Sequence, residues 1–377
     1  MFGASTARRL GAAAWLVGTL LGVQAQPIVV AQIGPFTVLP SPDAKEVNEG
    51  ARAWFAQVNQ AGGVRGRPIE LFELDDKFNA DEFARQFDTA MKRRPVALLT
   101  PIGSAALNKL VNDKLLDKHP VAIINAIPGA EPFRKPGHAR LFHVRAGDRQ
   151  QFEKIVLHAR TLGVRKLGVL YQELPIGHAG VKAVQEIAQQ APALEVPSAV
   201  AQHDPDLIGI AARRVAAAQP QAVVVVGSPK FMADAVEALR KAGARQFLFA
   251  LSYMPAGLVA KVAGEAGSRG VAIAQTFPNP NGATLRLQRE FQAAMRALQP
   301  DAKSFTSFQL EGFVAARVLV EGLRRTSGDI DADGIARALK GMGPLDLGGF
   351  YVSFEKSNEG SSFVDIGVVS AGGKLIY

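Results

Sequence analysis

The stretch of residues 28–76 constrains the fold more than any other part of the chain. It opens with an apolar run at 28–33, rich in β-branched side chains, which is typical of a buried parallel strand. From Asp43 onward apolar side chains recur at helical spacing, and the glycine pair at 62–63 supplies the left-handed turn that ends such a helix. Residues 69–74 then alternate as a second strand. The sequence therefore predicts a βαβ unit, whose right-handed crossover makes its two strands parallel.

The rest of the chain repeats this alternation. Further strands are predicted at 96–100, 121–125, 167–171, 222–226, 247–250 and 270–274, and the helices between them at 81–91, 104–116, 150–162, 180–190, 206–218 and 230–242. A Pro- and Gly-rich loop at 126–140 separates two such runs. Two more helices, at 283–297 and 304–325, precede a Gly-rich tail that we expect to be irregular. The fold class predicted for these 377 residues is α/β, with two doubly wound lobes.

The amino-acid sequence of the opening βαβ unit resembles that of a known family. Residues 50–67 read GARAWFAQVNQAGGVRGR and are followed by Asp75-Asp76, which is similar to the start of periplasmic binding proteins of the branched-chain amino acid (Leu/Ile/Val) type. This resemblance implies a type I periplasmic binding protein fold, with a ligand cleft between two lobes that three hinge crossovers join. The implied first lobe comprises residues 26–141 and 278–360, and the second comprises 142–277 and 361–377. The implied hinges lie near 141–145, 275–278 and 358–361.

The N-terminus is typical of an export signal. Arg8 and Arg9 precede an apolar run at 10–23, and small residues up to Ala25 offer a cleavage site. An uncleaved membrane anchor is the alternative, but the run is shorter than the roughly 20 residues that a spanning helix needs. The chain has no cysteine, which excludes disulfides and a lipid-modified N-terminal cysteine. We therefore expect a periplasmic protein whose signal peptide, residues 1–25, is removed.

The sequence lacks the patterns of the common enzyme classes. It contains no G-x-S-x-G, no G-x-x-x-x-G-K-[ST], and no H-E-x-x-H among its six histidines. The adjacent Asp75 and Asp76 are interpreted as a solvated turn at the end of a strand. The net charge of +9 falls by two, to +7, without the arginines of the signal peptide, and its lysines and arginines are spread along the chain. We expect no catalytic activity, no cofactor, no metal ion and no nucleic-acid partner.

Ligands of open α/β sheets bind at the carboxyl ends of the strands, so the first residues after each strand are the candidate contacts. Ser104 stands out because a strand feeds a helix there, and exposed N–H groups together with a hydroxyl suit a carboxylate. Its alternative role is to cap its own helix. In the resembling family a serine at this position holds the ligand's α-carboxylate. The candidate ligand-binding residues are Phe36, Ile102, Gly103, Ser104, Ile127, Pro128, Glu173, Ile176, Ser228, Ser252, Tyr253 and Phe308.

Other contacts that the resemblance implies are missing from this chain. A threonine that binds the carboxylate aligns with Gly129, and the acid that pairs with the ligand's amino group aligns near Ser252. No Asp or Glu lies within residues 250–264, and Glu173 is more simply interpreted as a solvated loop acid. Because a buried ammonium without a partner is unfavourable by several kcal/mol, the sequence favours an amine-free organic acid over a free amino acid.

The resemblance implies a function in import. The chain would be the solute-binding component of an ABC importer, closing about its hinges on a small solute and docking on an inner-membrane permease as a monomer. A sensory or regulatory receptor that uses the same fold is the alternative, since fold alone does not separate the two.

Overall fold

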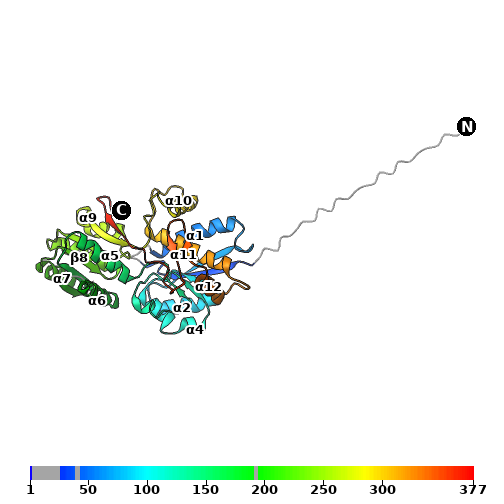
Figure 1. The fold of residues 1–377 in the computed structure, drawn as a ribbon, viewed down its shortest axis with the longest axis horizontal. Coiled ribbons are helices and arrows are strands. Elements are labelled where there is room, and N and C mark those ends of the chain that lie inside the picture. Colours follow the sequence, from blue (N-terminus) through cyan, green and yellow to red (C-terminus); the bar gives the residue numbers. More distant parts are fainter. Residues whose placement is uncertain (2–25, 39–42, 191–193) are drawn as a thin grey trace.

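The computed structural model describes Met1 and residues 26–38, 43–190 and 194–377; the expected signal peptide and its cleavage site lie outside these residues apart from Met1. Figure 1 shows two lobes side by side, one with α6, α7 and α9 and the other with α1, α2, α4 and α12. Each lobe is built on its own sheet. Within the described residues no helix has the length and apolar character that crossing a bilayer requires.

The first lobe contains a five-stranded sheet in the order β2-β1-β3-β4-β5, with every pairing parallel. Its elements are β1 (Ile28–Gly34), α1 (Asp43–Gln60), β2 (Ile69–Asp75), α2 (Ala80–Met91), β3 (Ala97–Leu99), α3 (Ser104–Val111), α4 (Leu115–Lys118), β4 (Ala122–Ile124), a 3₁₀ turn (Glu131–Phe133) and β5 (Leu141–Phe142). Later in the chain come α10 (Arg286–Leu298), α11 (Ser307–Arg325), α12 (Ala332–Gly341) and the short strands β11 (Leu345–Asp346) and β12 (Tyr351–Val352). Of these, α11 packs against α1, β3 and β4.

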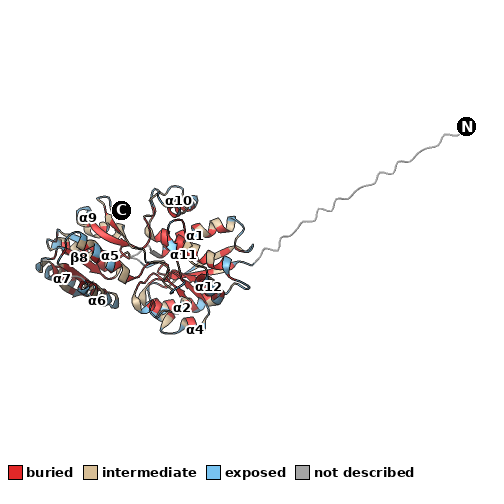
Figure 2. Cartoon of the chain, in the orientation of Figure 1, coloured by how far each residue is buried: buried red, intermediate tan, exposed pale blue. Residues whose placement is uncertain are grey.

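Alternate residues of the first sheet enter two different cores. Ala31 and Ile33 of β1 belong to a cluster with Phe83 and Phe87 of α2, whereas Val30 belongs to a cluster with residues of α1 and α11. Both faces of the sheet are therefore covered by helices, as a doubly wound fold requires. Figure 2 shows buried strands and exposed outer faces of the helices.

The second lobe contains a seven-stranded sheet in the order β14-β13-β10-β9-β8-β6-β7. Its elements are α5 (Asp148–Thr161), β6 (Leu167–Gln172), α6 (Pro175–Gln189), β7 (Ser198–Ala201), α7 (Pro205–Ala217), β8 (Ala222–Val226), α8 (Pro229–Lys241), β9 (Phe247–Ala250), α9 (Ala256–Ser268), β10 (Val271–Gln275), β13 (Asp365–Val369) and β14 (Leu375–Ile376). The strands from β6 to β10 are parallel, and the two last strands of the chain add antiparallel at one edge.

The expected α/β class is confirmed, and several elements were missed or misjudged. The tail after residue 325 is not irregular: it contains α12 and four short strands, and Asp331 caps α12 by accepting the N–H of Gly334 at 2.6 Å. The helix expected over 104–116 is broken, because Lys114 adopts a left-handed φ of 59° between α3 and α4. Helix α9 and the short edge strand β7 had no counterpart in the prediction, since a Gly-rich segment and a four-residue strand give weak periodicity.

Helices α1 and α11 approach each other closely through two glycines. A Cβ atom added to Gly312 would lie 1.9 Å from the carbonyl oxygen of Val47, and one added to Gly50 would lie 1.8 Å from that of Gln309. Trp54 then packs edge-on against Phe313, with ring centroids 5.3 Å apart. Because the obstructing atoms are backbone, neither position accommodates a side chain without moving a helix.

Three segments connect the lobes: the one from β5 to α5, the one from β10 to α10, and the one that leads into β13. The first and third run side by side, because His143 donates its N–H to Asn358 at 2.8 Å and accepts the N–H of Gly360 at 2.7 Å. In the second, the side chain of Gln275 accepts hydrogen bonds from Ser307 at 2.6 Å and from the C-terminal residue Tyr377 at 3.3 Å.

His143 is buried at this junction, and one of its ring nitrogens lies 3.1 Å from the carbonyl oxygen of Phe133. Burial lowers the pKa of His143 to about 3, and the positive charge of Arg134 contributes to the same shift. The imidazole is therefore neutral in the folded protein across the range in which an exposed histidine takes up a proton.

Substitution of Gly312 tests the contact between α1 and α11. We expect Gly312→Ala to lower the free energy of unfolding by about 3 kcal/mol, because the new methyl group meets the backbone of α1. Gly257→Ala is the matched control, since its Cβ would have no neighbour within 4 Å, and we expect it to stabilise the protein by about 0.5 kcal/mol. Denaturant unfolding measures both, and equal effects of the two variants would contradict the close approach.

The pKa of His143 predicts a loss of stability in acid. Between about pH 6.5 and pH 3 the unfolded chain binds a proton at this residue and the folded protein does not, so stability falls as the pH falls. From about pH 7 to about pH 5 we expect wild type to lose about 2 kcal/mol more than the non-titrating variant His143→Gln, measured by urea unfolding.

Comparing wild type with His143→Gln cancels the contributions of the other titrating groups to the pH dependence of stability. Burial raises the pKa of Asp76 to about 6, which acts in the opposite sense: the folded protein holds that proton more tightly and gains stability as the pH falls through this range. Asp76 is present in both proteins, so its contribution cancels. Equal losses in wild type and His143→Gln would show that His143 does not set the acid response.

Candidate functional site

The candidate site lies where the carboxyl ends of strands from both sheets meet. Ile102, Ile127 and Phe308 of the first lobe and Tyr253 of the second are buried in one contiguous apolar cluster. Phe36 and Ile176 are half-buried and pack against the same cluster. These six side chains, from segments up to 272 residues apart in sequence, belong to or pack against one cluster that also contains the core of the second lobe. The apolar contact between the two lobes removes surface from water but does not by itself fix their relative orientation.

A buried polar network lies beside the apolar cluster. Arg145, in the first crossover, is fully buried and pairs with Glu311 of α11, its Nη1 lying 3.2 and 3.3 Å from the two carboxylate oxygens. Asn125, after β4, donates from Nδ2 to Glu311 at 2.8 Å and accepts the N–H of Arg145 at 3.0 Å. The other amino group of Arg145 donates to the hydroxyl of Ser252 in the second lobe. Burial raises the pKa of Glu311, and the charge of Arg145 opposes that rise.

Tyr253 closes a second hydrogen-bonded ring between the lobes. Its hydroxyl donates to Asp148 at the start of α5 and accepts the N–H of Gly129 at 2.8 Å, while Asp148 donates its own N–H to the carbonyl of Gly129 at 3.0 Å. A side chain at position 129 would collide with this ring. Burial raises the pKa of both Asp148 and Tyr253. The N–H of Gly129, at the position that the resemblance aligns with a carboxylate-binding threonine, is thus occupied by Tyr253.

The remaining candidates at the strand ends have diverse surroundings. The residue that caps α3 is Gly103, with a φ of 100° and no side-chain cap, so Ser104 is the first helical residue and does not cap its own helix. Pro128 is buried in the loop that carries Gly129. Ser228 donates its backbone N–H to the side-chain oxygen of Gln172 at 2.8 Å. Glu173 is half-exposed and pairs with His178 at 2.5 Å.

The interpretation of Asp75 and Asp76 as a solvated turn is wrong for Asp76, which is buried, whereas Asp75 remains partly exposed. Asp75 accepts the N–H groups of Phe36 at 2.9 Å and Lys77 at 3.1 Å, which ties the loop after β1 to the end of β2. Asp76 is 1% exposed and accepts the N–H of Phe78 at 2.8 Å. Burial raises its pKa to about 6, with a further contribution from the charge of Asp75. The carboxylate of Asp75 thus fixes the loop that carries Phe36, and that of Asp76 fixes the turn at Phe78.

Sequence reasoning missed Arg145, Asp148, Gln151 and Glu311, the side chains that form the polar part of the site. One signal was available: Glu311 interrupts the apolar run of α11 and is buried there, which is unusual unless the charge is paired. Arg145 follows a strand end, within a predicted hinge. Among the described residues no group of three or more histidine, aspartate and glutamate side chains is arranged to hold a metal ion.

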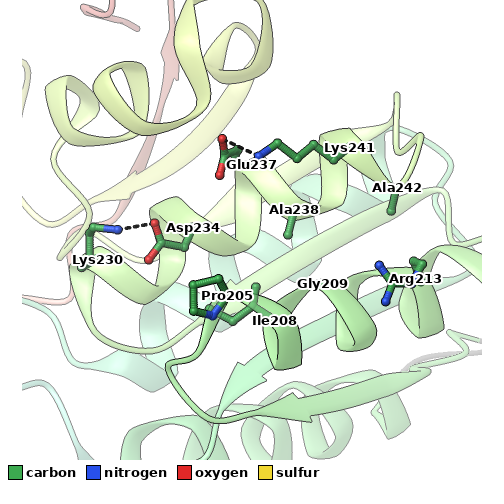
Figure 3. A pocket seen from close by; sticks show the side chains of 10 residues that line it. All are labelled: Pro205, Ile208, Gly209, Arg213, Lys230, Asp234, Glu237, Ala238, Lys241 and Ala242. Carbon is green, nitrogen blue, oxygen red and sulfur yellow. Dashed lines mark hydrogen bonds and ion pairs between the residues drawn. The ribbon is translucent and has the colours of Figure 1, made fainter.

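A groove of about 280 Å³ lies elsewhere, between α7 and α8 on the second lobe (Figure 3). Pro205, Ile208 and Gly209 line one side of it. On α8 Lys230 pairs with Asp234, and Lys241 pairs with Glu237 at 2.8 Å. None of the candidate residues lines this groove, and two of its lysines already have carboxylate partners on the same helix.

Comparison with known proteins defines the family. A family model described as a periplasmic binding protein matches residues 27–374, whereas no curated protein matches the chain. An extracellular ligand-binding receptor from Verminephrobacter eiseniae is 46% identical over 93% of this chain and 100% of that chain, with a TM-score of 0.89. A substrate-binding periplasmic protein from Ralstonia solanacearum is 30% identical over 93% and 99%, with a TM-score of 0.83.

A third solved structure shares the fold at lower identity. It is a leucine-binding protein from Thermotoga maritima, 18% identical over 93% of this chain and 97% of that chain, with a TM-score of 0.80. From the family match over residues 27–374 and the relative at 46% identity, the chain belongs to the periplasmic binding proteins, has their type I fold, and is a solute-binding protein and not an enzyme.

Proposed function

We propose that this protein is the periplasmic solute-binding component of an ABC importer, and that its solute is a small organic acid bound between the lobes. The observation that carries this proposal is the meeting of both lobes at the strand ends, where the apolar cluster and the Arg145–Ser252 contact lie side by side. The signal peptide would be removed near Ala25, and the protein would dock on its permease as a monomer. No cofactor or metal takes part.

Closure about the three crossovers is the mechanism that we propose. Solute between the lobes would add contacts to both of them, and those contacts would favour the closed state that the permease recognises. The residues proposed to contact the solute are Phe36, Ile102, Gly103, Ser104, Ile127, Pro128, Ile176, Ser228, Ser252, Tyr253 and Phe308. Glu173 is a weaker candidate, because its carboxylate already pairs with the half-exposed His178. The lobe boundaries at residues 141, 277 and 360 follow from the same proposal.

The charges at the site favour an acid over an amino acid. The position that the resemblance aligns with an amine-binding acid is Ser252, and the guanidinium of Arg145 donates to it. An ammonium group there would meet a cation instead of a carboxylate. The hydroxyl of Tyr253 contacts the carboxyl group of Asp148. Burial raises the pKa of Asp148 and so disfavours the ionised carboxylate that an ammonium group would need as a partner. The 18% identical leucine-binding protein shares the fold, and its ligand does not transfer to this chain.

A receptor role is the second candidate. The 46% identical relative is described as an extracellular ligand-binding receptor, a wording that fits sensing as well as import. Genes for a permease and an ATPase beside the gene for this protein would favour import, and a neighbouring histidine kinase would favour sensing.

Ligand screening followed by solution scattering tests the proposal. We expect a member of a panel of carboxylic acids, amides and amino acids to raise the melting temperature of protein that starts at Gln26, because ligand at 100 times its Kd stabilises the folded state by about 2.7 kcal/mol. The same solute should bring the lobes closer together in solution scattering. A saturating solute that leaves the lobe separation unchanged would contradict closure.

A further inference from the structure

Gln151, in the first turn of α5, carries a buried amide whose orientation is fixed. The side chain is fully buried, and its Oε1 accepts the N–H of Ser252 at 3.0 Å. Since only the oxygen of an amide can accept that hydrogen bond, the amino group Nε2 must occupy the opposite position. Nε2 has no hydrogen-bond acceptor among the residues that the structure describes. A buried amino group of this kind requires an acceptor from outside that part of the chain.

A second side-chain donor, Arg145, lies beside Ser252. Arg145 donates to Ser252 Oγ, so the hydroxyl hydrogen of Ser252 is directed toward another acceptor. The guanidinium of Arg145 lies 4.8 Å from the ring centre of Tyr253 and also pairs with Glu311 at 3.2 Å. The N-terminus of α5, a helix of 14 residues, adds the positive end of its dipole. Gln151 thus carries a donor without an acceptor among the described residues, Ser252 is hydrogen-bonded to Gln151, and Arg145, paired with Glu311, is hydrogen-bonded to Ser252.

We propose that these three side chains form a subsite for a carboxylate of the solute. The inference deepens the proposed function and rests on it. Carboxylate oxygens are acceptors only, and they match the amino group of Gln151 and the hydroxyl of Ser252. An ammonium group is a donor only, so it cannot accept the hydrogen bond that the amino group of Gln151 offers. Gln151 and Ser252 belong to the second lobe, where the resemblance implies an amine contact, so the polarity of the proposed subsite is reversed relative to that expectation.

Replacing the side-chain amino group of Gln151 by an oxygen tests the proposed carboxylate subsite. Gln151→Glu keeps an oxygen for the N–H of Ser252 but replaces the amino group by a negatively charged oxygen. We expect this variant to bind acids at least about tenfold more weakly than wild type, because a like charge faces the carboxylate. Gln151→Met, which removes the donor without adding charge, should weaken binding less. Gln185→Glu on the exposed face of α6 is the matched control and should bind as wild type does.

The probes are acid and amide pairs that share one carbon skeleton: 4-methylpentanoate with 4-methylpentanamide, benzoate with benzamide, and 3-phenylpropanoate with 3-phenylpropanamide. Leucine and phenylalanine complete the panel, and calorimetric titration measures each Kd. In wild type we expect at least one acid to bind about tenfold more tightly than its amide and the amino acids. Should Gln151→Glu fail to fold, Ser252→Ala keeps the backbone N–H and should still weaken acid binding selectively.

The possible results of these titrations test the carboxylate subsite independently of the proposed function. Tighter binding of an amide or amino acid than of every acid, equal acid binding by Gln151→Glu and wild type, or no acid binding at all would each overturn the subsite. If an amide or amino acid nevertheless closes the lobes in scattering, the proposed function stands without the subsite. Acid binding that depends on Gln151 but does not close the lobes would support the subsite and contradict the mechanism of closure.

Discussion

The buried ion pair between Arg145 and Glu311 is the interaction on which the junction of the lobes depends. Both side chains are almost inaccessible to solvent, so each charge has lost its hydration and relies on the other. Removing one partner from such a pair destabilises a protein by about 3–5 kcal/mol, because the remaining charge stays buried. Asn125 and Ser252 provide further hydrogen bonds to the two charges. Four segments distant in sequence are thereby held at one point.

The apolar and polar parts of this junction have different roles. Ile102, Ile127 and Phe308 exclude water without imposing a direction, whereas the hydrogen bonds of Tyr253 to Gly129 and Asp148 require one relative placement of the two lobes. Burial strengthens those hydrogen bonds because the local dielectric is low. Together the apolar cluster and these hydrogen bonds give the two lobes one defined relative placement.

The sequence predicts the scaffold better than the site. The strands at 222–226 and 247–250 have the expected bounds, because uninterrupted β-branched or aromatic runs are local signals. The polar part of the site is not local: the orientation of Gln151 depends on the N–H of Ser252, 101 residues away. Asp76 was misjudged for the same reason, since nothing in its immediate sequence shows that it is buried. Helix α12 could have been predicted, as Asp331 is a good N-cap and Ile335 and Leu339 have helical spacing.

The packing of α1 against α11 has a consequence for the order of folding. Thr306, which caps α11, donates its hydroxyl to Glu46 of α1, 260 residues earlier in the chain. The core of the first lobe therefore remains incomplete until almost the whole polypeptide has been synthesised, although all five strands of its sheet lie within the first 142 residues. Contacts so far apart in sequence form slowly, because a long loop must close before they add stability. We therefore expect a nascent chain of this protein to complete the core of its first lobe later than a chain whose domains are contiguous.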